Sequence, residues 1–144
     1  MPDDILLTLL DGLTLPDDLS EAVPLLLRAH DHPRTAVHCA AVASEARRLA
    51  ERFGVDPGKA EMGGWLHDIS AAFTRDQRLP ATKALGLEVL PVEEMVPMIV
   101  HQKLSAEMAR QLFGVEDEEV LSAIRCHTTL RPGATPLDMV VFLA

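Results

Sequence analysis

Aromatic residues are scarce in this 144-residue sequence, where they make up 3% of the chain, with one tryptophan and no tyrosine. Cysteine is nearly absent as well. Cys39 and Cys126 lie far apart and form no CxxC pair, which argues against a disulfide framework and against a thiolate zinc site. Only 13 basic residues face 22 acidic ones, and they are scattered. The resulting net charge of −9 argues against a general nucleic-acid binder, since phosphate affinity needs clustered Lys and Arg.

Long apolar runs are missing too. The run from Ile5 to Leu10 is short, no basic leader precedes it, and nothing approaches the roughly 18 apolar residues of a membrane span. We therefore expect a soluble cytoplasmic protein with no membrane partner. A hydrophobic share of 48% is enough for one domain that buries about two thirds of its unfolded surface. Ala, Leu and Val dominate at helical spacing, which predicts an all-α domain.

Helical periodicity divides the chain into two parts. Residues 1–30 hold two short Leu-rich segments, which predict an N-terminal helical cover, and residues 31–144 form the main domain. Glycine caps, an acidic N-cap and a capping box then predict helices over Thr35–Phe53, from His101 to Gly114, from Asp117 through His127, and from Thr135 onward. Between Phe73 and Pro91 the pattern weakens. We expect one short helix bracketed by Pro80 and Gly86, with a loop that forms a pocket rim.

The central element is predicted over Ala60–Ser70, AEMGGWLHDIS, as a helix without a solvent face. Large apolar residues occupy one side of it, and small residues with His67 and Asp68 occupy the other. Gly63 and Gly64 each cost about 1 kcal/mol relative to Ala in a helix interior, so we expect a neighbouring backbone to approach closely there.

Four histidines fall at inward or seam positions of four predicted helices: His38, His67, His101 and His127. A single inward histidine is usually a satisfied core residue. Four of them beside Asp68 predict a metal site, because imidazole nitrogen and carboxylate oxygen suit Fe, Mn, Zn or Ni. Whether one ion or two are bound stays open. The second His-Asp pair, His30-Asp31, lies before Pro33 and is predicted to be a solvated turn.

With these residues located, the chain resembles the HD superfamily of metal-dependent phosphohydrolases, in particular its YqeK-like branch, over about Arg34 to Ala144. The matching runs are RTAVHCAAV, GGWLHDIS, VHQKLSAEMARQLFG, AIRCHTTLRPG and PLDMVVFLA. The resemblance implies a compact helical bundle around a central metal-binding helix. It also implies a divalent metal centre, commonly iron, with manganese or zinc as alternatives, whose ligands include His38, His67, Asp68, His101 and His127.

The activity that the resemblance implies is symmetrical hydrolysis of diadenosine tetraphosphate to two ADP, with Asp68 and His67 as catalytic residues. A bound cation suits this chemistry because it supplies a nucleophile at neutral pH and relieves charge on the phosphoryl oxygens. In a two-metal form Asp68 would bridge the ions. His38 and His67 would hold one ion, and His101 and His127 the other. The phosphate-contact candidates are Lys103, Arg125, Thr128 and Arg131.

Two other classes stay open: a phosphohydrolase of ordinary nucleotides, and a regulatory module that binds metal and nucleotide without turnover. The sequence does not fix the oligomeric state, and a homodimer is one possibility. Leu130 stands where the resemblance leads us to expect glycine. The last helix shows no stop signal at Ala144, so we expect the functional chain to continue with a carboxylate ligand for the metal.

Overall fold

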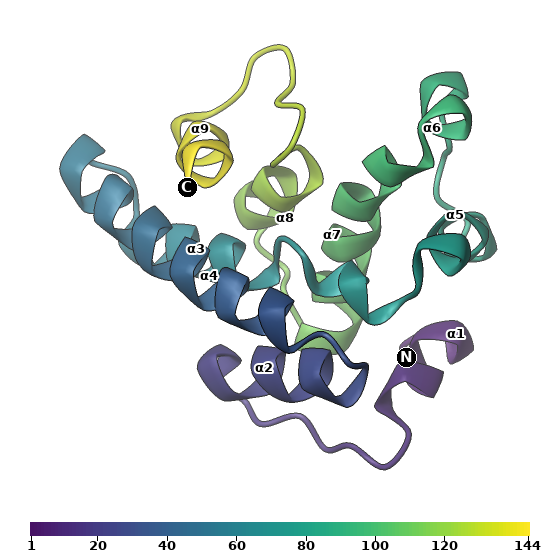
Figure 1. Ribbon diagram of the computed structural model, residues 1–144. Helices are drawn as coiled ribbons and strands as arrows, with labels where there is room; N and C mark the ends of the chain where they lie inside the picture. The colour runs from purple at the N-terminus through teal and green to yellow at the C-terminus, as the bar shows by residue number, and fades with distance from the viewer.

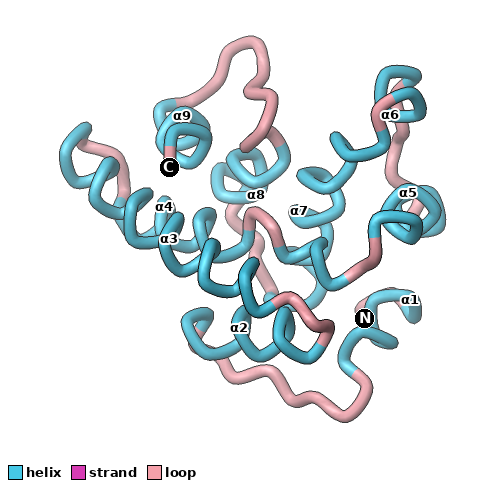
Figure 2. Tube along the Cα trace, viewed as in Figure 1, coloured by secondary structure: helices cyan, strands magenta, loops and turns pink.

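The structure, a computed structural model, describes residues 1–144, and every regular element in it is helical (Figures 1 and 2), which confirms the all-α prediction. In chain order the elements are α1 (Asp4–Leu7), η1 (Thr8–Leu10), α2 (Leu19–Ala29), α3 (Pro33–Phe53), α4 (Pro57–Leu66), η2 (Ile69–Ala72), α5 (Arg75–Ala84), α6 (Pro91–Met95), η3 (Pro97–Ile99), α7 (Val100–Phe113), α8 (Glu118–Arg125) and α9 (Pro136–Leu143). None of these helices has both the length and the apolar character that crossing a membrane requires.

The predicted helix ends are mostly where the sequence put them. Gly54 and Gly114 adopt left-handed conformations, with φ of 71° and 66°, and close α3 and α7. Asp117 caps α8 by accepting backbone N–H groups of its first turn. Thr135 and Asp138 form the predicted capping box at the start of α9.

Helix α4 lies at the centre of the fold, packed against α2, α3, α8 and α9 (Figure 1). Every residue of α4 except Gly58 is at least partly buried. A Cβ atom on Gly64 would lie only 2.5 Å from the Cα of Ala43 in α3, so the contact between the two helices requires glycine there. The predicted close approach is thus confirmed at Gly64, whereas Gly63 faces the side chain of Val141.

The prediction of one continuous helix over Ala60–Ser70 is wrong in its second half. Helix α4 ends at Leu66, and the chain passes through His67 and Asp68 into the short helix η2. The prediction for His127 fails in the same way, because α8 ends at Arg125 and His127 follows in a turn. Each helix ends one or two residues before the histidine, His67 or His127, and the hydrogen bonds of these rings are described below.

Other differences concern the right-hand side of Figure 1 and the outer surface. Pro80 lies inside α5 instead of bounding a helix, because the capping box of Thr74 and Gln77 starts the helix earlier. An additional short helix, α6, precedes Pro97. Phe53, Met95 and Met98 are exposed, whereas Met108 is buried.

Candidate metal centre

Four imidazole rings from four different parts of the chain converge on Asp68. The Nε2 atoms of His38 and His67 lie 3.1 Å apart, and those of His101 and His127 lie 3.0 Å apart. His38 comes from the first turns of α3, and His67 follows α4. His101 opens α7 and His127 follows α8. The structure therefore brings together all five residues that the sequence proposed as ligands.

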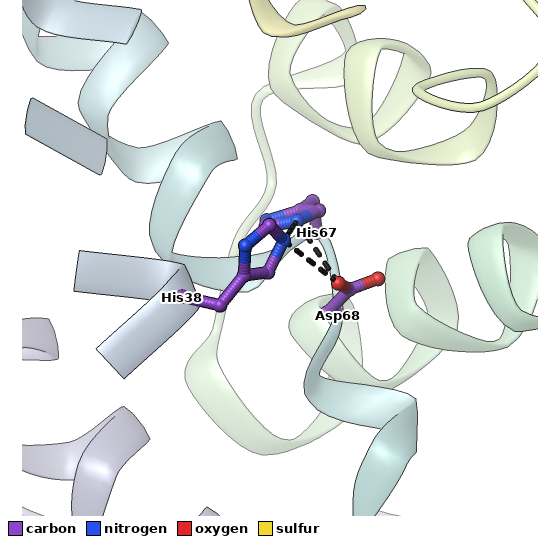
Figure 3. A group of neighbouring side chains, drawn as sticks. All are labelled: His38, His67 and Asp68. Carbon is purple, nitrogen blue, oxygen red and sulfur yellow. Dashed lines mark hydrogen bonds and ion pairs between the residues drawn. The ribbon is translucent and has the colours of Figure 1, made fainter. Parts of the chain in front are cut away.

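The two carboxylate oxygens of Asp68 divide between the two histidine pairs. Oδ2 lies 3.3 Å from His38 Nε2 and 3.1 Å from His67 Nε2, the pair drawn in Figure 3. Oδ1 lies 3.7 Å from His101 Nε2 and 3.5 Å from His127 Nε2. The five side chains thus form two groups of three ligand atoms that share Asp68, each compact enough to surround one ion.

A common hydrogen bond fixes three of the rings. Nδ1 of His67, His101 and His127 lies 2.6–2.7 Å from the backbone carbonyl oxygen three residues earlier, on Gly64, Met98 and Ile124. Within a continuous helix such a carbonyl accepts the N–H four residues on, whereas the last turn leaves its carbonyls free. Helices α4 and α8 end early enough to free the carbonyls that these rings use. This is the physical reason why the continuous-helix prediction failed at both histidines.

The same hydrogen bonds test whether the cluster fits a metal. Nδ1–H of His67, His101 and His127 donates to its carbonyl, so in the neutral form each of these three rings turns an Nε2 lone pair toward the cluster and the Asp68 carboxylate. Protons on every ring would instead set like charges about 3 Å apart. A divalent cation at this position would accept the lone pairs and remove the need for protons that repel one another. Backbone carbonyls behind metal-bound histidines are also a common arrangement. The donor set therefore fits a transition metal.

Burial and charge keep the ligands in the forms that bind metals. Burial raises the pKa of Asp68, but the surrounding imidazoles, His127 and His67 foremost, outweigh it and hold that pKa well below its ordinary value. Burial also lowers the pKa of His101, which favours the neutral ring. The nearby Cys39 thiol is different: burial, with a further contribution from Asp68, raises its pKa to about 12, so the free thiol stays protonated.

The cluster is most exposed at His38. The side chains of His67, His101 and His127 are largely buried, whereas that of His38 is 53% exposed. The prediction that His38 points inward is thus only half right, because its Nε2 faces the cluster while the rest of the ring borders solvent. A substrate can reach the metal-binding atoms along the side of His38.

Three of the four phosphate-contact candidates already have carboxylate partners. Lys103 Nζ contacts Glu93 and the carbonyl of Glu88. Arg125 pairs with Glu118, and Arg131 donates through Nε to the buried Asp138. The Lys103 contact ties α7 to α6, the Arg125 pair lies within α8, and the Arg131 contact ties the loop after α8 to α9.

Thr128 is the candidate that lies at the cluster itself. Its Oγ1 is 3.1 Å from His101 Nε2, and its backbone N–H donates to the side chain of Gln102. The same loop contains Leu130, whose φ of 57° is a left-handed conformation that glycine adopts without strain. This explains why the resemblance leads us to expect glycine at that position.

Sequence reasoning missed two features beside the cluster. Ser70 and Ser105 are buried and hydrogen-bonded to each other, and Ser70 also donates to the carbonyl of His101, which fixes η2 against α7. Arg78 on α5 is half-buried, and its Nε donates to the carbonyl of Phe73. No carboxylate lies within ion-pair distance of it. Ser70 and Arg78 follow Asp68 closely along the chain, but neither they nor Ser105 stand out in a helical pattern, so the sequence carries no specific signal for them.

The predicted turn at His30 and Asp31 is also more ordered than expected. Asp31 is exposed with φ of 63°, which fits a turn, but the His30 ring is partly buried and its Nε2 lies 2.8 Å from the carbonyl of Leu9. This bond links η1 to the end of α2, so His30 has a structural role in the fold.

The capping carboxylate of α9 yields a stability prediction. Asp138 is fully buried and accepts hydrogen bonds from Ser122, Arg131 and Thr135. We expect Asp138→Ala to lower the free energy of unfolding by about 3–5 kcal/mol, because it leaves a charge-assisted network without its acceptor. Denaturant unfolding measures this.

The control is the exposed pair of Glu118 and Arg125, where Glu118→Ala should cost under about 1 kcal/mol. Burial raises the pKa of Asp138, but the Thr135 N–H and Arg131 outweigh it and leave that pKa below 3.8. The contribution of Asp138 is therefore complete above pH 3.8 and lost as pH falls through the lowered pKa. Equal losses of stability in the two variants at pH 7 would contradict the assignment.

Comparisons with known proteins agree with this geometry. The sequence model of the HD domain family matches residues 35–144. A Lactococcus lactis subsp. cremoris protein described as "uncharacterized protein in pepC 5'region" is 43% identical over 90 residues, which cover 62% of this chain and 46% of that protein. A Bacillus subtilis protein named "Bis(5'-nucleosyl)-tetraphosphatase, symmetrical" is 34% identical over 110 residues, which cover 75% of this chain and 58% of that protein. This chain thus spans about half the length of these two relatives.

A solved structure is similar as well. The crystal structure of a "predicted HD superfamily hydrolase involved in NAD metabolism" from Clostridium acetobutylicum superposes with a TM-score of 0.78 at 25% sequence identity. The match covers 84% of this chain and 64% of that one.

Proposed function

The chain belongs to the HD domain family, and on that premise we propose that it is a metal-dependent phosphohydrolase that cuts diadenosine tetraphosphate symmetrically into two ADP. The observation that carries the proposal is the cluster in which Asp68 lies between two pairs of imidazole nitrogens. Support for the substrate comes from the Bacillus subtilis relative, whose name specifies a symmetrical tetraphosphatase.

The ligand arrangement favours two ions. His38 and His67 with Asp68 Oδ2 would hold one, and His101 and His127 with Asp68 Oδ1 the other. Imidazole and carboxylate donors suit iron, manganese and zinc, and we propose iron as the resident metal. When bound, such a metal lowers the pKa of a coordinated water toward about 7 and neutralises charge on the phosphoryl oxygens.

The protein's own groups then have defined tasks. Asp68 fixes the spacing of the two halves of the centre and balances part of the positive charge. The backbone carbonyls behind His67, His101 and His127 hold each Nε2 toward the position the metal would occupy and keep the tautomer constant. Thr128, with Oγ1 beside His101 Nε2, is placed to hydrogen-bond a phosphoryl oxygen. The exposed flank of His38 is the entry side.

The products test the proposal. We expect the metal-loaded protein to release ADP as the sole nucleotide from diadenosine tetraphosphate, because attack at the central anhydride divides the molecule equally. Anion-exchange chromatography of a time course separates the nucleotides. Diadenosine triphosphate serves as the matched comparison, since it has no central anhydride. Release of AMP plus ATP would overturn symmetrical attack, and the absence of turnover with any nucleotide would overturn the hydrolase.

A further inference from the structure

Five arginines of this chain have no carboxylate partner, and three of them lie near the histidine cluster in sequence. All three lysines of this acidic chain, and the arginines 47, 48, 110, 125 and 131, contact carboxylates. The arginines without such a partner are Arg28, Arg34, Arg52, Arg75 and Arg78. Three of these flank the cluster in sequence: Arg34 lies one helical turn before His38, and Arg75 and Arg78 open the helix that follows η2.

Arg78 lies close enough to Asp68 and His101 for their charges to act on one another, and the preceding residue on α5, Gln77, lines a cavity. Its Nε donates to the carbonyl of Phe73, which leaves the two terminal nitrogens of the guanidinium without a hydrogen-bond partner in the protein. Burial lowers its pKa and the neighbouring Arg75 lowers it further, while Asp68 acts in the opposite direction. A half-buried cation beside another cation, in a chain of net charge −9, is stabilised by an anionic ligand.

The cavity, of about 650 Å³, starts where η2 ends. One wall is the η2–α5 junction and the other is η1 with the end of α2, and Figure 1 shows α1 next to α5 on that side of the molecule. Its apolar lining includes Leu9 and Phe73. Its polar lining includes Gln77, whose side-chain oxygen accepts the Thr74 N–H and whose NH₂ group stays free to donate. This size and mixture are typical of small-molecule sites.

The cavity is within reach of the metal cluster. The four residues of η2 separate Asp68 from Phe73 and span roughly 8 Å at about 2 Å per residue of 3-10 helix. A diphosphate with its ribose can bridge that separation.

We propose that this cavity is the subsite for a terminal nucleoside of the substrate and that Arg78 binds the phosphate between it and the metal centre. The inference rests on the proposed function for the identity of the ligand, a nucleoside polyphosphate. It assigns phosphate contact to Arg78 in addition to the candidates that the sequence suggested.

Binding measurements on the metal-loaded protein test the subsite without turnover. The probes are ADP and inorganic diphosphate, followed by isothermal titration calorimetry. We expect Arg78→Gln to weaken both probes about tenfold or more, since hydrogen bonds to charged groups contribute about that much. The matched control is Arg52→Gln, another unpaired arginine, which stacks on Phe53 at the far end of α3 and should leave both affinities unchanged.

Two variants fill the cavity from opposite walls. Thr8 and Ala84 both line it and are exposed, so Thr8→Phe and Ala84→Phe should fold normally, which thermal unfolding checks. We expect each to weaken ADP about tenfold and to leave diphosphate within about twofold, because the rings occupy the nucleoside volume alone. Unchanged ADP affinity in both filled variants would overturn the nucleoside subsite. Unchanged diphosphate affinity in Arg78→Gln would overturn the role of Arg78.

The outcome is separable from that of the proposed function. ADP binding that depends on Arg78 and on the cavity, in a protein that hydrolyses no nucleotide, supports the subsite and overturns the hydrolase. Hydrolysis of diadenosine tetraphosphate with unchanged KM in the filled variants supports the hydrolase and overturns the subsite.

Discussion

Asp68→Ala should remove metal from both halves of the centre and lower the rate of diadenosine tetraphosphate hydrolysis by roughly a thousandfold or more. Asp68 is the one residue whose oxygens face all four imidazoles, at 3.1–3.7 Å from their Nε2 atoms. Metal assistance supplies several kcal/mol of transition-state stabilisation, and each 1.36 kcal/mol corresponds to a tenfold change in rate. Elemental analysis of the purified variant, together with its rate, measures both effects.

His38→Ala is the informative partner of that variant. His38 belongs to only one group of ligands and is the most exposed of the four histidines, so its loss should deplete one ion and leave the other. We expect about half the metal of the wild type. If Asp68→Ala and His38→Ala lost the same amount of metal, the arrangement of two groups sharing Asp68 would be wrong.

Metal removal should destabilise the fold as well as stop the reaction. The ligands come from four helical segments, so an ion that binds only the folded state holds α3, α4, α7 and α8 together. Free metal at a thousand times its dissociation constant adds about 4 kcal/mol of stability. For a domain of this size that corresponds to a fall in Tm of roughly 10 °C on treatment with a chelator.

Calorimetric scans with and without chelator measure this shift, and re-addition of metal should restore both Tm and rate. The control is Asp68→Ala, whose Tm should not respond to chelator because its sites are already lost. A chelator that lowered the Tm of wild type and variant equally would act on the chain by some route other than this centre.

The five candidate ligands could be predicted from the sequence because of their chemical type and spacing. Four imidazoles at inward positions are expensive unless they converge, and the structure brings His101 and His127, 26 residues apart, to 3.0 Å. The all-α class followed from helical periodicity and from caps such as Gly54, which depend on local backbone chemistry alone.

The sequence could not indicate where the helices stop at the ligands. Hydrophobic periodicity does not distinguish a helix that continues past Leu66 from one that ends there. It treated His67 and His127 as helical, whereas both follow a helix end and their rings contact a backbone carbonyl three residues earlier. A ligand-bearing residue near a predicted helix end is therefore a reason to shorten that helix.

The partners of the cationic side chains could not be predicted from the sequence either. Lys103, Arg125 and Arg131 were candidates because they lie near the histidines in sequence, yet each faces a carboxylate of the fold. Arg78 has no such partner, and only the packing of α5 beside η2 and α7 reveals it. Pairing partners are a property of the fold, so the charges left free for a ligand appear only once the helices are placed.

The most direct test of the central claim is a titration of the metal-free protein with Fe²⁺ under anaerobic conditions, with bound metal and ADP release from diadenosine tetraphosphate measured in the same samples. The account predicts that hydrolysis is absent without metal, rises with bound metal and becomes constant at two ions per chain. Hydrolysis at the full rate by metal-free protein would contradict it, as would two bound ions without any release of ADP.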